Sequence, residues 1–272
     1  MPFCNCNASS LVLQRVTRSP EMATDADSRH LNRVVVTANL ECYLPSAIEL
    51  AIAIARSNNS GLHGLFIEDL DLLRVAGLPF SSEISLASGQ VRILDSQQVT
   101  LGFNARSRHF RRSLLRQAEK SSLPWSYSKA RGGKLSKALE ESINAEFLVI
   151  GQSRGALNAA GTTRPGRILL IDNHSQRLFQ ALDVVLDNFI GLPFELLFVP
   201  RSSGISANTT ELLSAKLSSH PQGRLVELNP ESLPEVIRTP GAPISSVIVS
   251  RHQPELMREV LQHLSCPMIV VS

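Results

Sequence analysis

One pattern of strand, helix and strand occurs twice in this chain. Arg33–Ala38 is a β-branched apolar run, followed by an apolar helix at Ala47–Arg56 and a strand at Leu62–Ile67. Arg167–Ile171 starts the same order again, and its helix leads to a strand at Phe194–Val199. Unbroken apolar runs are typical of strands buried on both faces of a parallel sheet. The chain is therefore predicted to build one right-handed α/β unit twice.

Both copies continue with further helices and strands. In the first copy these are a helix at Gln97–Ser121, a strand at Leu123–Lys129, a helix at Leu135–Ile143 and a strand at Phe147–Ile150. In the second they are Thr210–Leu217, Arg224–Leu228, Ser232–Arg238 and Ser246–Val249, then a last helix and the closing strand Pro267–Val271. The first copy is longer by about the length of an insert at 68–96, so the copies agree once it is removed.

The insert is predicted to contain a short helix around Leu70–Val75, an apolar anchor at Leu78–Phe80 that packs against something, and a loop at Ser81–Gln90. It leaves from the carboxyl end of a strand, where binding loops often lie. Two interpretations stay open. The insert is a lid over a site, or it is a surface elaboration that fills a groove or makes a dimer contact.

A glycine pair follows the strand Phe147–Ile150. Gly151 and Gly155 flank a short polar loop at the carboxyl end of that strand, which is where ligands bind in open α/β sheets. A glycine-rich loop there turns backbone N–H groups toward a phosphate. A plain strand-to-loop turn is the alternative reading of the same glycines.

Composition excludes several classes of protein. The net charge of +3 over 272 residues is too small to argue for nucleic acid or an anionic membrane as an obligatory partner. No apolar run approaches the roughly 20 residues of a membrane span. Four cysteines without metal-ligand or disulfide spacing predict no metal site and a cytosolic protein. Residues 1–30 are predicted to be a disordered arm, and Met22 suggests that residues 1–21 are an upstream extension.

The order of elements resembles a tandem universal stress protein. The most specific parts of the resemblance are Glu146–Gly155 and Cys266–Val271, and it covers about residues 33–272. The resemblance implies an α/β fold with two Rossmann-like three-layer domains, at 31–163 and 164–272, each with a parallel sheet of order 3-2-1-4-5. It also implies a stress-response role without catalysis, and pairing through the last strand, either between two chains as a homo-oligomer or between the two domains. Many members of the family bind ATP or AMP, whereas others bind no nucleotide.

The nucleotide site implied for the first domain consists of six residues that only partly match the family's pattern. Asn39 stands where nucleotide-binding members usually carry an aspartate, and the phosphate loop is shorter than theirs. In the second domain Asp172 occupies the aspartate position, but Ser250–Pro254 replaces the glycine loop, so this domain is predicted to bind no nucleotide. The implied site residues are Asn39, Gly151, Ser153, Gly155, Gly161 and Thr162.

Three other functions are alternatives to nucleotide binding. The first is a pairing module that binds no nucleotide. The second is an enzyme, which the scattered histidines and the lack of a serine–histidine–acid pattern disfavour. The third is nucleic-acid binding through arginines of the 97–121 helix, although a solvated helix face gives the same stripe. The arginines in question are Arg106, Arg108, Arg111, Arg112 and Arg116.

Overall fold

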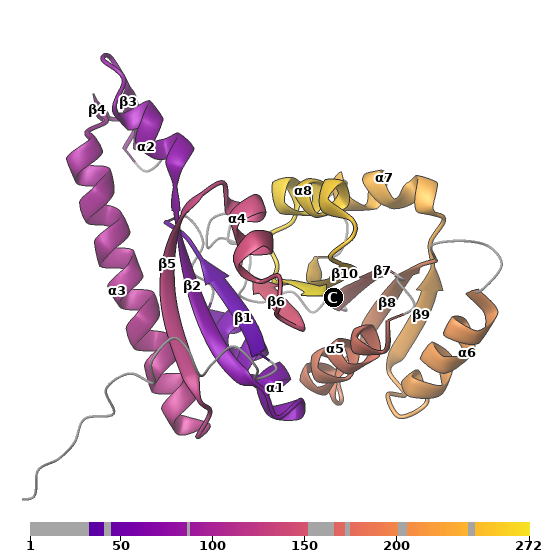
Figure 1. The fold of residues 1–272 in the computed structure, drawn as a ribbon. Helices are drawn as coiled ribbons and strands as arrows, with labels where there is room; N and C mark the ends of the chain where they lie inside the picture. The colour runs from indigo at the N-terminus through magenta and orange to yellow at the C-terminus, as the bar shows by residue number, and fades with distance from the viewer. Residues whose placement is uncertain are drawn as a thin grey trace, which may run out of the picture. The chain divides into compact units, whose positions relative to one another are not determined.

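The apolar runs of the sequence form the strands of one large sheet in the computed structural model (Figure 1). The model describes residues 33–40, 45–85, 88–151, 166–171, 175–200, 206–238 and 243–272. The chain divides into two units, Met1–Leu31 and Asn32–Ser272, and all the described residues belong to the second. The predicted arm at 1–30 therefore lies outside the described residues.

The first half of this unit, residues 33–151, follows the predicted order of elements, with the addition of a small hairpin, β3–β4. Most boundaries agree with the prediction to within three residues. The elements are β1 (Arg33–Ala38), α1 (Pro45–Ser57), β2 (Gly61–Asp69), α2 (Leu70–Ala76), β3 (Ser82–Ile84), β4 (Val91–Ile93), α3 (Ser96–Lys120), β5 (Trp125–Gly132), α4 (Lys134–Glu141) and β6 (Phe147–Ile150).

The second half, residues 166–272, also follows the predicted order. Its elements are β7 (Gly166–Ile171), α5 (Gln176–Leu186), the 3₁₀ turn η2 (Asp187–Phe189), β8 (Phe194–Val199), α6 (Ser206–Leu217), β9 (Gly223–Glu227), the 3₁₀ turn η3 (Pro230–Ser232), α7 (Leu233–Arg238), β10 (Ile244–Ser250), α8 (Pro254–His263) and β11 (Met268–Val271).

The strand order confirms the α/β class and corrects the number of sheets. Nine strands form a single sheet in the order β5-β2-β1-β6-β11-β10-β7-β8-β9. The second half has the expected order 3-2-1-4-5. The first half contributes only the strands that correspond to 3-2-1-4. The prediction of two separate five-stranded sheets was therefore wrong, because the described residues of the first half contain no fifth strand.

The position of that missing strand is taken by β11. This strand pairs in parallel with β10 of its own half and antiparallel with β6 of the other half, where Met268 is opposite Ile150 and Val271 is opposite Phe147. The closing strand is thus hydrogen-bonded on both edges. Because an exposed strand edge is what recruits another chain, β11 offers no free edge for pairing with a second molecule.

Strand register is the same in the two halves. Val34 of β1 lies between Leu62 of β2 and Phe147 of β6, and Ile168 of β7 lies between Leu196 of β8 and Ser246 of β10. Positions can therefore be compared between the halves residue by residue.

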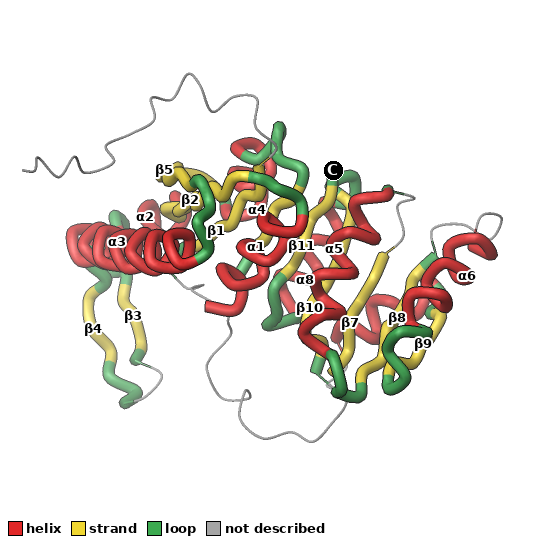
Figure 2. Tube along the Cα trace, turned by 90° about the horizontal axis from the view of Figure 1, so that it is seen from below, coloured by secondary structure: helices red, strands yellow, loops and turns green. Residues whose placement is uncertain are grey.

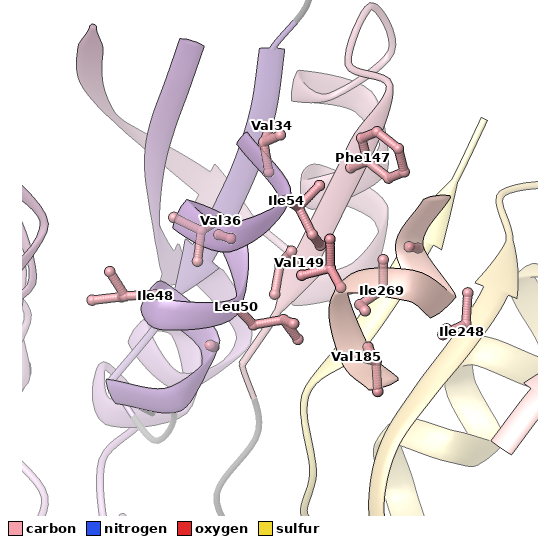
Figure 3. Close-up of a cluster of buried hydrophobic side chains, with 14 of the residues drawn as sticks. Val34, Val36, Ile48, Leu50, Ile54, Phe147, Val149, Val185, Ile248 and Ile269 are labelled. Carbon is pink, nitrogen blue, oxygen red and sulfur yellow. The ribbon is translucent and has the colours of Figure 1, made fainter. Parts of the chain in front are cut away.

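Two layers of apolar side chains cover the two faces of the sheet. One layer, against α1, α3, α5 and α6, runs without a break from the first half into the second. Figure 3 shows Ile54 and Leu50 of α1 close to Val149 of β6, Ile269 of β11 and Val185 of α5. The other layer packs against α4, α7 and α8. The two halves therefore share their hydrophobic core.

Helix α3 confirms the predicted division into a buried and a solvated face. Phe103, Phe110 and Leu114 are each no more than 1% exposed. The helix comes close to the sheet because β2 has a glycine beneath it: a Cβ on Gly64 would lie 2.4 Å from a methyl carbon of Leu114. The predicted stripe of Arg108, Arg112 and Arg116 lies on the exposed face.

The insert contains a hairpin that was not predicted. Strand β3 lies within the predicted loop at Ser81–Gln90 and pairs antiparallel with β4 just after it, with Ile84 opposite Val91. The predicted anchor is not packed within the described part of the chain, since Leu78 is 60% exposed and Phe80 is 99% exposed. The surface against which this anchor is predicted to pack is therefore not among the described residues of the chain.

Cys266 is a buried free thiol that we expect to be unreactive in the folded protein. It is 4% exposed, and burial raises its pKa to about 12. A thiolate is the reactive species. With Cys4, Cys6 and Cys42 replaced by serine, a thiol reagent at pH 8 should label the protein only after unfolding. Because the folded pKa exceeds that of an ordinary thiol, the contribution of Cys266 to stability should be present below pH 9 and decline as the pH rises toward 12. Rapid labelling of native protein would contradict this assignment.

Candidate functional site

The candidate site lies where the strand order of the first half reverses. Strands β1 and β6 are parallel neighbours: from β1 the chain passes through α1 to β2 on one side of it, and from β5 it returns through α4 to β6 on the other side. The crevice at the carboxyl ends of such a pair is the usual ligand position in open α/β sheets. Asn39 follows β1 directly and Gly151 follows β6 directly. The structure therefore brings these two predicted site residues to one edge of the sheet.

Both residues are buried, and Asn39 is only 4% exposed. The residue next to it, Leu40, accepts a hydrogen bond on its carbonyl from Nε of Arg106 on α3, at 3.3 Å. Arg106, one of the arginines of α3 named above, thus connects α3 to the residue that follows the end of β1. The remaining predicted site residues, Ser153, Gly155, Gly161 and Thr162, lie outside the described residues.

Thr37 is a residue of this edge that the sequence analysis missed. Thr37 is the next-to-last residue of β1 and lies beside Ile150 of β6, and it is 3% exposed. Its hydroxyl oxygen has no hydrogen-bond partner among the described residues. A buried hydroxyl without a partner costs about 1–3 kcal/mol. The β-branched run 33–38 predicted a strand, and Thr37 fits that run by shape, so its polarity gave no separate signal.

The second half has no comparable group at the matching position. Register places Ile171 of β7 where β1 has Thr37, and Ser250 where the first half has Gly151. Ser250 is buried, and its hydroxyl accepts a hydrogen bond from the backbone N–H of His252 at 3.3 Å. Asp172, the expected aspartate, lies outside the described residues.

Arg251 occupies the carboxyl end of β10 in the second half. It donates to the carbonyl oxygens of Leu139 and Ser142 at 3.0 and 2.7 Å, at the carboxyl end of α4 in the first half, and to the hydroxyl of Ser272 at 3.2 Å. Burial lowers the pKa of Arg251, but a guanidinium stays protonated at neutral pH. The segment that replaces a glycine loop therefore acts as a contact between the two halves.

A second contact between the halves lies beside that of Arg251, since both arginines donate to Ser272 near the amino end of β6. Arg177 of α5 pairs with the carboxylate of Glu146, which precedes β6, at 3.2 Å. Around this pair is a polar hollow of about 360 Å³, whose lining includes Asn58, Asn59 and Gln180. It lies beside the amino end of β6, so it is distinct from the edge at which Asn39 and Gly151 lie.

Serine and histidine do come together on the outer strands of the first half. The ring nitrogens of His63 on β2 lie 2.8 Å from the hydroxyl of Ser126 and 2.9 Å from that of Ser128 on β5. The sequence separation of more than sixty residues hid this cluster. It bridges two neighbouring strands, which is a structural use of a histidine. Among the described residues, no three or more His, Cys, Asp or Glu side chains are placed to hold a metal ion.

None of the described helices combines the length and apolar character of a membrane span.

Comparison with known proteins gives structural likeness only. No protein-family model matches the chain, and no curated protein matches it. A universal stress protein from Archaeoglobus fulgidus DSM 4304 has 9% identity and a TM-score of 0.40, over 89% of this chain and 99% of its own. The cytoplasmic domain of a prokaryotic cation chloride cotransporter also has 9% identity and a TM-score of 0.40, over 88% of this chain and 95% of its own.

A third structure, a Pseudomonas aeruginosa UCBPP-PA14 protein described as a universal stress protein, has 12% identity and a TM-score of 0.38, over 90% of this chain and 94% of its own. At TM-scores below 0.5 these likenesses assign no ligand or activity to the chain.

Proposed function

We propose that this chain is a cytosolic, non-catalytic regulatory protein of the universal stress protein type, which responds to an adenine nucleotide, ATP or AMP, held in its first half only. The observation that supports this most is the unpartnered hydroxyl of Thr37 at the point where β1 and β6 diverge. The fold does not need a polar group there, because the second half has isoleucine at the same position of the same strand pair.

The residues at this edge suit the sugar and base of a nucleotide. A hydroxyl both donates and accepts, and the side-chain amide of Asn39 does the same. An amide replaces one acceptor of a carboxylate with a donor, so we expect Asn39 to bind ribose hydroxyls more weakly than an aspartate would. Gly151, and in the proposal Ser153, Gly155, Gly161 and Thr162, would let backbone N–H groups approach the phosphates.

The second half, in this proposal, is a partner for the first half and not a second binding site. Arg251 fills the end of β10 with bonds to α4, and β11 closes the sheet of the first half. This also favours the second candidate function, a pairing module that binds no nucleotide. The two candidates differ in one measurable respect, the response to nucleotide.

Replacing Thr37 by valine should raise the stability of the ligand-free protein and weaken nucleotide binding. Valine has the same shape without the hydroxyl, so the unfolding free energy should rise by about 1 kcal/mol. Loss of a hydrogen bond to the nucleotide should weaken its binding about tenfold. Thermal unfolding with and without millimolar ATP or AMP measures both effects.

Ser250→Ala is the matched control in the second half. It removes a buried hydroxyl that has a partner, so it should lower stability and leave nucleotide affinity unchanged. Equal nucleotide affinity in wild type and Thr37→Val would contradict the assigned site. Absence of any response to nucleotide in the wild type would leave the pairing module as the function.

A further inference from the structure

The hairpin of the insert presents an apolar face that the described chain does not cover. Cross-strand pairs of β3 and β4 share a face, so Ile84, Val91 and Ile93 lie on one side, and the ion pair of Glu83 and Arg92 lies on the other. The three apolar residues are 64%, 65% and 81% exposed. Figures 1 and 2 both show the hairpin beyond the first turn of α3 and away from the large sheet. A two-stranded hairpin in water is marginally stable at best, so this one requires a partner.

Phe80 is a second, independent sign that the insert makes a contact. Its backbone has φ of +74°, a left-handed conformation that is costly for a bulky residue. Its side chain is nevertheless 99% exposed. Strain is tolerated where it serves a contact, and within the described chain this ring has none that would account for it.

The charges of the insert favour a neutral partner. The part of the insert that carries the apolar face, from Leu78 to Leu94, has two charged residues, Glu83 and Arg92, and they pair with each other. Nucleic acid or an anionic membrane would require unpaired basic residues. The insert also has no Trp or Tyr, the residues that mark a membrane interface. A second copy of the same surface meets it without repulsion between like charges.

The exposed apolar area is sufficient for a dimer. At about 150–200 Å² for a whole apolar side chain, the exposed groups of the insert present on the order of 700 Å². A standard interface buries about 800 Å² on each partner. The residues counted are Val75, Leu78, Phe80, Ile84, Val91 and Ile93.

We propose that this hairpin, together with Leu78 and Phe80, is the interface of a two-fold symmetric homodimer, in which the apolar faces of two inserts pack on one another. A surface that contacts itself across a two-fold axis needs to be self-complementary, and a neutral apolar face satisfies this. The contact uses no residue of the candidate nucleotide site. It is also separate from β11, which is bonded on both edges inside the chain.

Sedimentation velocity from low micromolar to about 200 μM tests the proposal. We expect a monomer–dimer equilibrium in the full chain. The double variant Ile84→Ser/Ile93→Ser should weaken dimerisation at least 100-fold, with an unchanged circular dichroism spectrum because both side chains are exposed. Phe80→Gly, which suits a positive φ, should weaken it at least tenfold while the monomer becomes no less stable.

The control is Ile190→Ser/Leu192→Ser, which removes two apolar side chains of the second half that are 72% and 54% exposed. It should dimerise like the wild type. A strict monomer at 200 μM, or a dimer indifferent to the hairpin variants, would overturn the proposal. Flotation of the wild type with phosphatidylcholine vesicles, lost in the hairpin variant, would assign the face to lipid and would also overturn it.

Discussion

Replacing Ile269 by alanine is expected to lower the free energy of unfolding by about 3 kcal/mol, with both halves of the protein unfolding together at a lower denaturant concentration. Ile269 is fully buried in the core layer that both halves share, on the strand that pairs with β10 and β6. Truncating a buried isoleucine to alanine costs 2–5 kcal/mol, because apolar contacts are lost and a cavity remains.

The single tryptophan allows the unfolding of the first half to be followed separately. Trp125 is on β5, at the first-half end of the sheet, whereas Ile269 is on the last strand of the second half. Tryptophan fluorescence therefore reports the first half, and far-ultraviolet circular dichroism reports both. The two urea transitions should coincide and should move together. An exposed position, Ile190→Ala, serves as control and should shift neither. An unchanged fluorescence transition in Ile269→Ala would mean that the halves are independent.

Replacing Arg251 by methionine should lower the free energy of unfolding by about 2–4 kcal/mol. Arg251 belongs to the second half, but its partners Leu139 and Ser142 belong to the first. The methionine removes the guanidinium donors of the carbonyls of Leu139 and Ser142, which keep only the hydroxyl of Ser142 at 3.5 Å and the backbone N–H of Ala145 at 2.9 Å. A hydrogen bond involving a charged group contributes about 1.5–3 kcal/mol, and two of them are lost.

Arg251→Lys is the informative companion variant. Lysine keeps the charge but cannot place two donors in a planar fork, so it should recover no more than half of the loss. Urea unfolding followed at Trp125 measures both variants. Arg258→Met removes an arginine whose pair with Glu255 is exposed, and it should change stability by less than 0.5 kcal/mol. Equal, small effects at both arginines would show that Arg251 does not connect the halves.

Periodicity was enough to locate nearly every helix and strand, because most of them are buried and their apolar residues follow the period of the element. The long strand runs and the α3 face are examples: Phe103, Phe110 and Leu114 were assigned to one face and are buried together. The hairpin was missed because three residues on each strand are too few for alternation to stand out from a polar loop.

The continuous sheet could not be read from strand patterns alone. An apolar run such as Met268–Val271 shows that a strand is buried, but it does not say which strand lies on each edge. One signal was present. The first copy has no run that corresponds to Pro267–Val271, so an order of five strands could not be complete there. Antiparallel pairing across the halves supplies the missing neighbour.

At the candidate site, position was easier to predict than polarity. Gly151 was found because it follows a buried strand, and Asn39 was implied by the family resemblance; the register places both at one edge. Thr37 was overlooked because a threonine in a β-branched run has the shape of a valine, and only burial reveals that its hydroxyl lacks a partner. The partner of the apolar anchor Leu78–Phe80 could not be predicted either, because a sequence shows that a segment is apolar but not whether the surface it packs against is in the same chain.

Calorimetric titration of the full chain with ATP and with AMP is the most direct test of the proposed function. The account predicts saturable binding of one nucleotide per chain, which Thr37→Val weakens and Ser250→Ala leaves unchanged. Two nucleotides per chain would contradict the assignment of the second half as a partner of the first, and no heat of binding at millimolar nucleotide would remove the ligand from the account.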